Sequence, residues 1–200
     1  MIIIPFLLFA FAAMATVHEL GHKFAAWLCR VTVPKVQIGV GPSICTFRFW
    51  RTAWTFGILP LGGYTRVHGM LASDARVPVL GDFRLLHPIQ QGFIVLGGPL
   101  GNIALACALH GLLALTDGAA FTDTMMAAAR APLSIGAGVI ALWLDAVGIH
   151  MDAMDLRTMD GSWHGMVHTL ATGSFLVALL NLVPTPVTDG GRLVKLICGR

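Results

Sequence analysis

Three long apolar segments constrain the fold of this chain more than any other feature. They cover about residues 2–29, 88–115 and 162–183, and each exceeds the roughly 20 residues that a helix needs to cross a hydrocarbon core of about 30 Å. Only 12% of the residues are charged, whereas a soluble domain has about 25%. So few charges cannot cover a water-facing surface. The sequence therefore predicts an α-helical polytopic membrane protein, with 1–200 forming a single membrane-embedded domain.

The region 31–66 has a different composition from the apolar segments. It is rich in Val, Ile, Thr, Phe and Trp and is interrupted by Gly and Pro, a pattern typical of short strands and turns. Trp50 and Trp54 lie near Arg48 and Arg51, and such pairing of aromatic rings with long cations is typical of membrane interfaces. We expect a membrane-associated β-hairpin or sheet whose exposed edge could pair with an extended substrate. An ordinary cytoplasmic β-loop explains the composition about equally well.

The distribution of charge predicts how the chain is oriented in the membrane. Between Lys23 and Arg84 the sequence has eight basic and two acidic residues, whereas 116–161 has six acidic and two basic residues. Because cytoplasmic loops carry an excess of Lys and Arg, we expect the region after the first segment to be cytoplasmic. The stretch 116–161 is then an excursion on the outer side.

The first apolar segment contains a polar cluster, His18-Glu19-Leu20-Gly21-His22. Two histidines four positions apart share one helix face, so both imidazoles can reach one metal ion. Glu19 is the only glutamate in the chain, and a carboxylate beside the first ligand can take a proton from a metal-bound water. Each ionisable group at this depth costs on the order of 3 kcal/mol, which favours a functional site. The alternative is a chance pentapeptide with buried, hydrogen-bonded histidines.

A catalytic zinc site takes three protein ligands and leaves a position for water, so a third ligand must come from another segment. Asp189 is the best candidate. It follows an apolar segment interrupted by Pro184 and Pro186 and precedes Gly190 and Gly191. Irregular backbone at membrane depth is tolerated where it lines a cavity, which suits a catalytic cleft. The alternative for Asp189 is a turn residue at the membrane surface.

Two motifs together resemble the site-2 protease family of intramembrane zinc metalloproteases. They are HELGH at 18–22 and NLVPTPVTDGG at 181–191, which match that family's H-E-x-G-H and N-x-x-P-x-x-x-x-D-G signatures. The stretches GVGP at 39–42, PLGGY at 60–64 and GGPLGN at 97–102 also resemble the family's membrane-associated β-region and the helix that follows it.

The resemblance implies a three-span catalytic core that binds Zn²⁺ and hydrolyses peptide bonds. It also assigns roles to six residues of this chain. The implied zinc ligands are His18, His22 and Asp189, the implied catalytic base is Glu19, and the residues implied to hold the substrate backbone are Asn102 and Asn181.

A further apolar stretch, 131–149, could be mistaken for a fourth span. One more crossing there would deliver Asp189 to the membrane face opposite His18 and His22. We therefore expect 131–149 to lie on the outer surface or to re-enter it. This topology leaves the two histidines and the aspartate at the same depth, toward the cytoplasm.

These inferences predict a zinc-dependent intramembrane endopeptidase in the inner, cytoplasmic membrane of a cell. Its substrate would be a single-pass membrane protein cut in or near its transmembrane segment, as in regulated intramembrane proteolysis, and its other partner is the lipid bilayer. The alternatives are a non-catalytic metal-binding scaffold or chaperone for single-pass proteins, and a small transporter that uses buried histidines as a relay. The mild net charge of +3, without a basic stripe, indicates that nucleic acid is not a partner. The sequence does not predict an oligomeric state.

Overall fold

The computed structural model describes residues 3–70, 78–117 and 162–198. The chain divides into two compact units, one formed by Ile3–Asn102 and Ala178–Arg200, the other by Ile103–Val177. The expectation that 131–149 lies on the outer surface falls outside the described residues, and the assignment of 1–200 to one domain stays a prediction.

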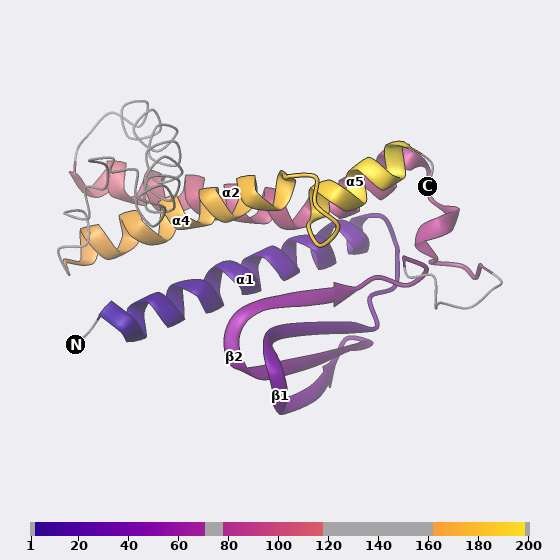
Figure 1. Ribbon diagram of the computed structural model, residues 1–200, viewed down its shortest axis with the longest axis horizontal. Helices are drawn as coiled ribbons and strands as arrows, with labels where there is room; N and C mark the ends of the chain where they lie inside the picture. Colours follow the sequence, from indigo (N-terminus) through magenta and orange to yellow (C-terminus); the bar gives the residue numbers. More distant parts are fainter. Residues whose placement is uncertain (1–2, 71–77, 118–161, 199–200) are drawn as a thin grey trace, which may run out of the picture. The chain divides into compact units, whose positions relative to one another are not determined.

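Three helices are long and apolar enough to cross a membrane in the part of the chain that the structure describes. They are α1 (Ile3–Leu28), α2 (Pro88–Asp117) and α4 (Trp163–Leu182) (Figure 1). Their bounds lie within two residues of the predicted segments, so the three predicted helices are confirmed. Many large apolar side chains on α1 are exposed, among them Phe9 and Phe11, as expected for a helix surrounded by lipid.

The predicted β-region forms a hairpin that follows α1 and precedes α2 along the chain. Strand β1 (Lys35–Phe49) pairs with the antiparallel strand β2 (Thr52–Arg66). The two turn residues, Trp50 and Arg51, both have positive φ angles of 47° and 64°, as in the tight turns whose twist matches a hairpin. The structure confirms a small antiparallel sheet after the first helix.

Both strands bend, and the bend decides which part of the sheet faces α1. Lys35 is in register with Ala53 on one side and with Arg66 on the other, so the start of β1 lies between the two halves of β2. The second half of β2, residues 63–66, is therefore an outer segment of the sheet. Figure 1 shows β2 running alongside α1.

A hydrophobic core joins the sheet to the helices of the first unit. Its members come from the end of α1, from β1, from the loop before α2 and from the first turns of α2. Burying these side chains fixes the sheet against the helix that carries the polar cluster. The core consists of Ala25, Ala26, Val31, Val33, Val36, Ile38, Val67, Phe83, Ile94 and Val95.

Glycines bring α1 and α2 into direct backbone contact within the first unit. A Cβ atom on Gly97 would lie 2.6 Å from the Gly21 carbonyl oxygen, and a Cβ on Gly21 would overlap the carbonyl oxygen of Gly97. Pro99 lies inside α2 without ending it. Close approach through small residues is the usual way in which helices associate in a bilayer, and here it aligns α2 with the polar turn of α1.

The second unit contains the end of α2 and most of α4. His110 is buried, and its Nδ1 lies 2.8 Å from the Ala106 carbonyl oxygen. Its ring meets the His168 ring edge to face, with centroids 5.6 Å apart. These contacts are those of two histidines packed between neighbouring helices.

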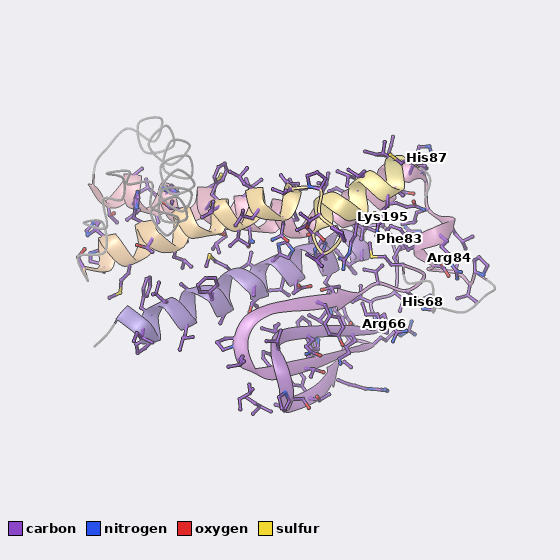
Figure 2. All side chains as sticks on the ribbon, in the orientation of Figure 1. Arg66, His68, Phe83, Arg84, His87 and Lys195 are labelled. Carbon is purple, nitrogen blue, oxygen red and sulfur yellow. The ribbon has the colours of Figure 1, made fainter. Side chains whose placement is uncertain are left out.

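A buried carboxylate organises the loop that leads into α2. Asp82 Oδ1 accepts hydrogen bonds from the backbone nitrogen and Nε of Arg84 at 2.8 and 3.0 Å, and Oδ2 accepts one from Nη2 at 2.6 Å. Gly69, at φ 82°, lies so close that a Cβ there would overlap the carboxylate. Figure 2 shows Arg84, Phe83 and His68 at this end of the molecule. The hydrogen bonds from the Arg84 side chain lower the pKa of Asp82 from 3.8 to about 2.

This pKa predicts an acid-sensitive contribution to folding. A carboxyl group whose pKa is lower in the folded chain stabilises the fold fully above its unfolded pKa, and this stabilisation is lost as the pH falls toward the folded value. Thermal unfolding in detergent should show a midpoint that falls between about pH 4 and 2 because of Asp82. Asp82→Asn should lower the midpoint at pH 7 and flatten its dependence in that window. Parallel curves for the two proteins would contradict this role.

Candidate metal centre

The two histidines of the polar cluster lie one helical turn apart on the buried face of α1. Both side chains are buried. Their rings meet edge to face with centroids 4.9 Å apart, and the Nε2 atoms of His18 and His22 are separated by 3.3 Å. The spacing of four residues places the Nε2 atoms of His18 and His22 close together on one helix face, as the sequence predicted.

Asp189 reaches this point because the chain turns sharply after α4. That helix ends at Leu182, and α5 (Asp189–Ile197) begins directly at the aspartate, with Thr188 as its N-cap. A Cβ on Gly191 would overlap the carbonyl oxygen of Thr185, so only glycine allows the first turn of α5 to pack against the preceding loop. The close packing at Gly191 thus fixes the position of the Asp189 backbone.

The aspartate and the two histidines meet. Asp189 Oδ2 lies 3.0 Å from Nε2 of His18 and 3.2 Å from Nε2 of His22, and the residue is 3% exposed. With zinc–ligand bonds of about 2.0–2.1 Å, donor atoms in a tetrahedral site lie about 3.3 Å apart. The three atoms therefore have a spacing that a zinc ion can occupy, and the three residues form a group that could hold a metal ion.

The ring nitrogen of His22 that faces away from this point, Nδ1, is placed to support metal binding through Nε2. Nδ1 of His22 lies 2.9 Å from the Ile94 carbonyl oxygen, a contact that requires the proton on Nδ1 and leaves the lone pair of Nε2 for a metal. The Gly98 amide also approaches Nδ1, at 3.3 Å, but the shorter carbonyl contact decides the tautomer. A second ring nitrogen bound to a backbone carbonyl is the usual support of a metal-binding histidine.

Asn102 takes the corresponding position behind His18. It is completely buried, and its Nδ2 lies 3.4 Å from Nδ1 of His18. If Nε2 of His18 binds a metal, Nδ1 carries the proton, and the amide turned by 180° presents its oxygen to it. The structure thus places Asn102 beside a ligand, whereas its predicted role in holding substrate stays a prediction.

Gly98 keeps the space that the ligand atoms need. A Cβ on this residue would lie 2.5 Å from Nε2 of both His18 and His22. The glycine-rich stretch 97–102 is evident in the sequence, but its composition does not reveal this function of Gly98. Only the approach of α2 to α1 shows that the missing side chain leaves room at the metal-binding point.

Glu19 lies beside the three ligands with an unsatisfied carboxylate oxygen. The residue is buried, and its Oε2 has no hydrogen-bond partner in residues 3–70, 78–117 and 162–198. A Cβ on Gly63 of β2 would lie 3.3 Å from Oε1, and Thr65 donates a hydrogen bond of 3.1 Å to the Glu19 carbonyl oxygen. The outer segment of β2 thus runs directly past this carboxylate.

Arg192 is a member of the site that sequence reasoning missed. Its Nη1 lies 3.3 Å from Asp189 Oδ1, one turn along α5. The guanidinium holds one carboxylate oxygen and leaves Oδ2 toward the histidines. The spacing of three residues within a helix is the signal that could have revealed it. Asn181 lies in the last turn of α4 and is partly buried; its predicted role in substrate binding is not tested.

Comparison with known proteins gives a family match over nearly the whole chain and individual relatives over about half to three fifths of it. Residues 6–200 match the model of peptidase family M50. Metalloprotease MmpA of Caulobacter vibrioides is 32% identical over 62% of this chain and 36% of its own length. Proteins provisionally named zinc metalloproteases, from Neisseria meningitidis and Helicobacter pylori, are 36% and 33% identical over 52% and 58% of this chain, and over 24% and 33% of their own lengths. The chain thus spans about a quarter to a third of these relatives.

The space beside Gly98 yields a test of the metal site. Gly98→Ala should displace the two imidazoles, which are flexible side-chain ends, more than the helices themselves, and so reduce zinc content several-fold. Gly92→Ala is the matched control, because a Cβ there meets nothing closer than 3.7 Å. Zinc per protein is measured by mass spectrometry on purified samples, with circular dichroism to verify helix content. Equal zinc in both variants would show that the ligands do not meet beside Gly98.

Proposed function

The chain belongs to peptidase family M50, and we propose that it is an intramembrane zinc metalloprotease of the site-2 type. It would hydrolyse a peptide bond in or near the transmembrane segment of a single-pass membrane protein. The observation that carries this proposal is the meeting of His18, His22 and Asp189 at one buried point beside Glu19. A metallopeptidase needs a metal site and a proton acceptor together, and these four side chains could provide both.

The three converging residues would hold the zinc ion. The fit rests on their donor spacing, on the carbonyl that orients His22 and on the space left by Gly98. When bound, zinc supplies Lewis acidity that makes water nucleophilic at neutral pH and polarises a carbonyl group. The Arg192 contact keeps Asp189 in the orientation that serves this site.

Glu19 would move the proton. Its buried Oε2 has no protein hydrogen-bond partner among the described residues, so it is available to accept a proton from the attacking water. The same carboxyl group can then donate that proton to the leaving amine. Burial of an unpaired carboxylate is unfavourable, and a catalytic role accounts for its presence at this position.

An extended substrate would lie along β2. A helical peptide hides its carbonyl groups in hydrogen bonds, so the substrate must unwind before attack, and pairing with a strand can hold it extended. The outer segment of β2, residues 63–66, lies beside Glu19: Gly63 is close to its carboxylate, and Thr65 donates a hydrogen bond to its carbonyl oxygen. Asn102 and Asn181 are proposed to help hold the substrate backbone.

The proposed location is the cytoplasmic membrane, with three helices crossing it and the active site toward the cytoplasm. The three candidate spans and the family match support a membrane protein. The orientation rests on the sequence, because the basic residues follow the first span and the acidic residues lie in 116–161.

A non-catalytic scaffold that binds metal and single-pass proteins remains the alternative function. It would use the same three ligands but has no need of Glu19. The buried, unpaired Oε2 of this residue favours the peptidase over the scaffold.

The two functions are distinguished by Glu19→Gln. This variant should retain zinc and lose at least about 100-fold in cleavage rate, the low end of the contribution of a general base, whereas Asp189→Ala should lose zinc as well. Membrane proteomes of cells with the native protein or with Glu19→Gln are compared, and a single-pass protein should accumulate uncut or as a longer fragment in the variant. Zinc content of the purified proteins is the control. Retained cleavage by Glu19→Gln would contradict the assigned base.

A further inference from the structure

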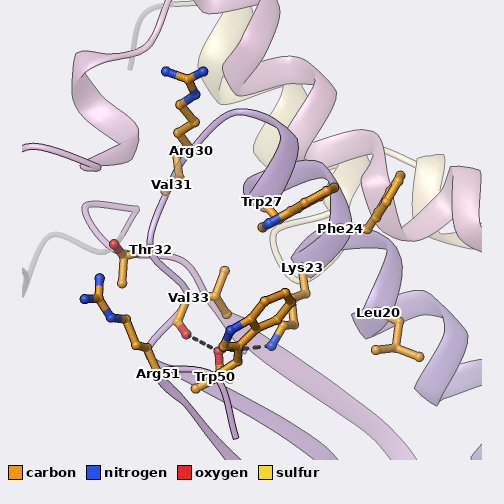
Figure 3. Close-up of a pocket in the computed structure, with 11 residues that line it drawn as sticks. Leu20, Lys23, Phe24, Trp27, Arg30, Val31, Thr32, Val33, Trp50 and Arg51 are labelled. Atoms are coloured by element: carbon orange, nitrogen blue, oxygen red, sulfur yellow. Dashed lines mark hydrogen bonds between the residues drawn. The ribbon is translucent and has the colours of Figure 1, made fainter.

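A pocket lies on the face of α1 that does not carry the candidate metal centre. It has a volume of about 800 Å³ and is bounded by the last turns of α1, the connection to β1 and the hairpin turn (Figure 3). None of the three proposed metal ligands, nor Glu19, lines it. The pocket belongs entirely to the first unit, at the end of α1 that the charge distribution predicts to be cytoplasmic.

One side of the pocket is apolar and faces outward from the helix. Leu20, Phe24 and Trp27 follow one another at helical spacing, and each is at least 41% exposed. Large exposed apolar side chains on a membrane-spanning helix contact lipid chains. This side of the pocket is therefore built to contact hydrocarbon.

The other side of the pocket is cationic. Arg51 lies near Thr32, and Arg30 extends in another direction from the end of α1; both lie away from Leu20 (Figure 3). Neither guanidinium forms an ion pair with a carboxylate in the described part of the chain, and the sequence has no acidic residue from 20 to 73. Among residues 3–70, 78–117 and 162–198, these two cations therefore have no carboxylate partner.

A third cation of the pocket, Lys23, is already engaged. Its Nζ donates a 3.0 Å hydrogen bond to Thr52 Oγ1 and lies 4.4 Å from the centre of the Trp54 ring. Lys23 therefore fixes the hairpin to α1 and adds positive charge to the pocket. The two arginines are left for a ligand.

Backbone conformation supports the same assignment of the arginines. Arg30 and Arg51 have φ angles of 58° and 64°, in the left-handed region that favours glycine or asparagine. Ordinary turn chemistry would place Asn or Gly at such positions. Large cations occur there instead, one just after the end of α1 and one in the hairpin turn.

We propose that this pocket binds an anionic phospholipid. The phosphate of the headgroup contacts Arg51, Arg30 adds positive charge at the same end of the pocket, and the acyl chains lie over Leu20, Phe24 and Trp27. The order of apolar and cationic side chains along the pocket matches the order of chains and headgroup in a phospholipid. The excess of cations without acids selects a lipid with net negative charge over a zwitterionic one, and a soluble acidic peptide would not use the exposed aromatic side.

The test measures lipid retention by native mass spectrometry of the detergent-purified full chain. Phosphatidylglycerol is the probe and phosphatidylcholine the zwitterionic control. Removing a cation near a membrane surface weakens anionic-lipid binding about fivefold, so Arg30→Gln and Arg51→Gln should each reduce phosphatidylglycerol retention by about that factor, and the double variant by more than tenfold. Arg48→Gln is the matched control, because Arg48 is an exposed hairpin arginine outside the pocket.

The outcomes separate a specific site from general attraction. Preference for phosphatidylglycerol that is lost in the double variant but retained in Arg48→Gln supports the site. Equal retention of the two lipids by the native protein, or an equal loss in Arg48→Gln, overturns it. Binding of a soluble polyglutamate peptide that depends on Arg30 and Arg51, without lipid preference, assigns the pocket to a peptide and also overturns it. Unchanged zinc content and melting temperature show that the variants are folded.

Discussion

The direct backbone contact between α1 and α2 is the constraint from which the site follows. In a bilayer, helices gain nothing from the hydrophobic effect when they associate, so close packing through small residues must hold them together. Gly21 and Gly97 supply that contact. It brings the Ile94 carbonyl within 2.9 Å of the His22 ring and places Gly98 where a side chain would displace both imidazoles. The same contact therefore packs the helices, orients one ligand and leaves space for the metal.

The arrangement of buried polar groups is consistent with a site completed by a cation. Buried ionisable groups are unfavourable unless they are paired. Three of them meet here, and Arg192 contacts one oxygen of Asp189. Metal binding at such a point contributes to the stability of the folded chain. Zinc is thus proposed both to support the packing of α1, α2 and α5 and to serve in hydrolysis.

The β-hairpin connects the two sites of the first unit. At one end of β2, Gly63 and Thr65 lie beside Glu19. The other end begins at the turn whose Arg51 lines the proposed lipid pocket, and Lys23 fixes that end to α1 through Thr52. A lipid headgroup bound at the turn would therefore hold the same sheet that is proposed to receive the substrate.

The sequence by itself predicted the three apolar helices, the β-region and the shared helix face of His18 and His22, because each depends on local rules, whereas Asp189 was a candidate from its place after a broken apolar segment and from the motif resemblance. Apolar length defines a span, and a spacing of four residues places His18 and His22 on one face. It did not reveal Gly98, Arg192 or Asn102 as neighbours of those ligands. Asn102 is 84 positions from His18, and no periodicity within one segment reports which faces of two helices meet. Only the tertiary structure decided this, because helix rotation and the turn before Asp189 are set by glycine contacts between segments distant in the chain.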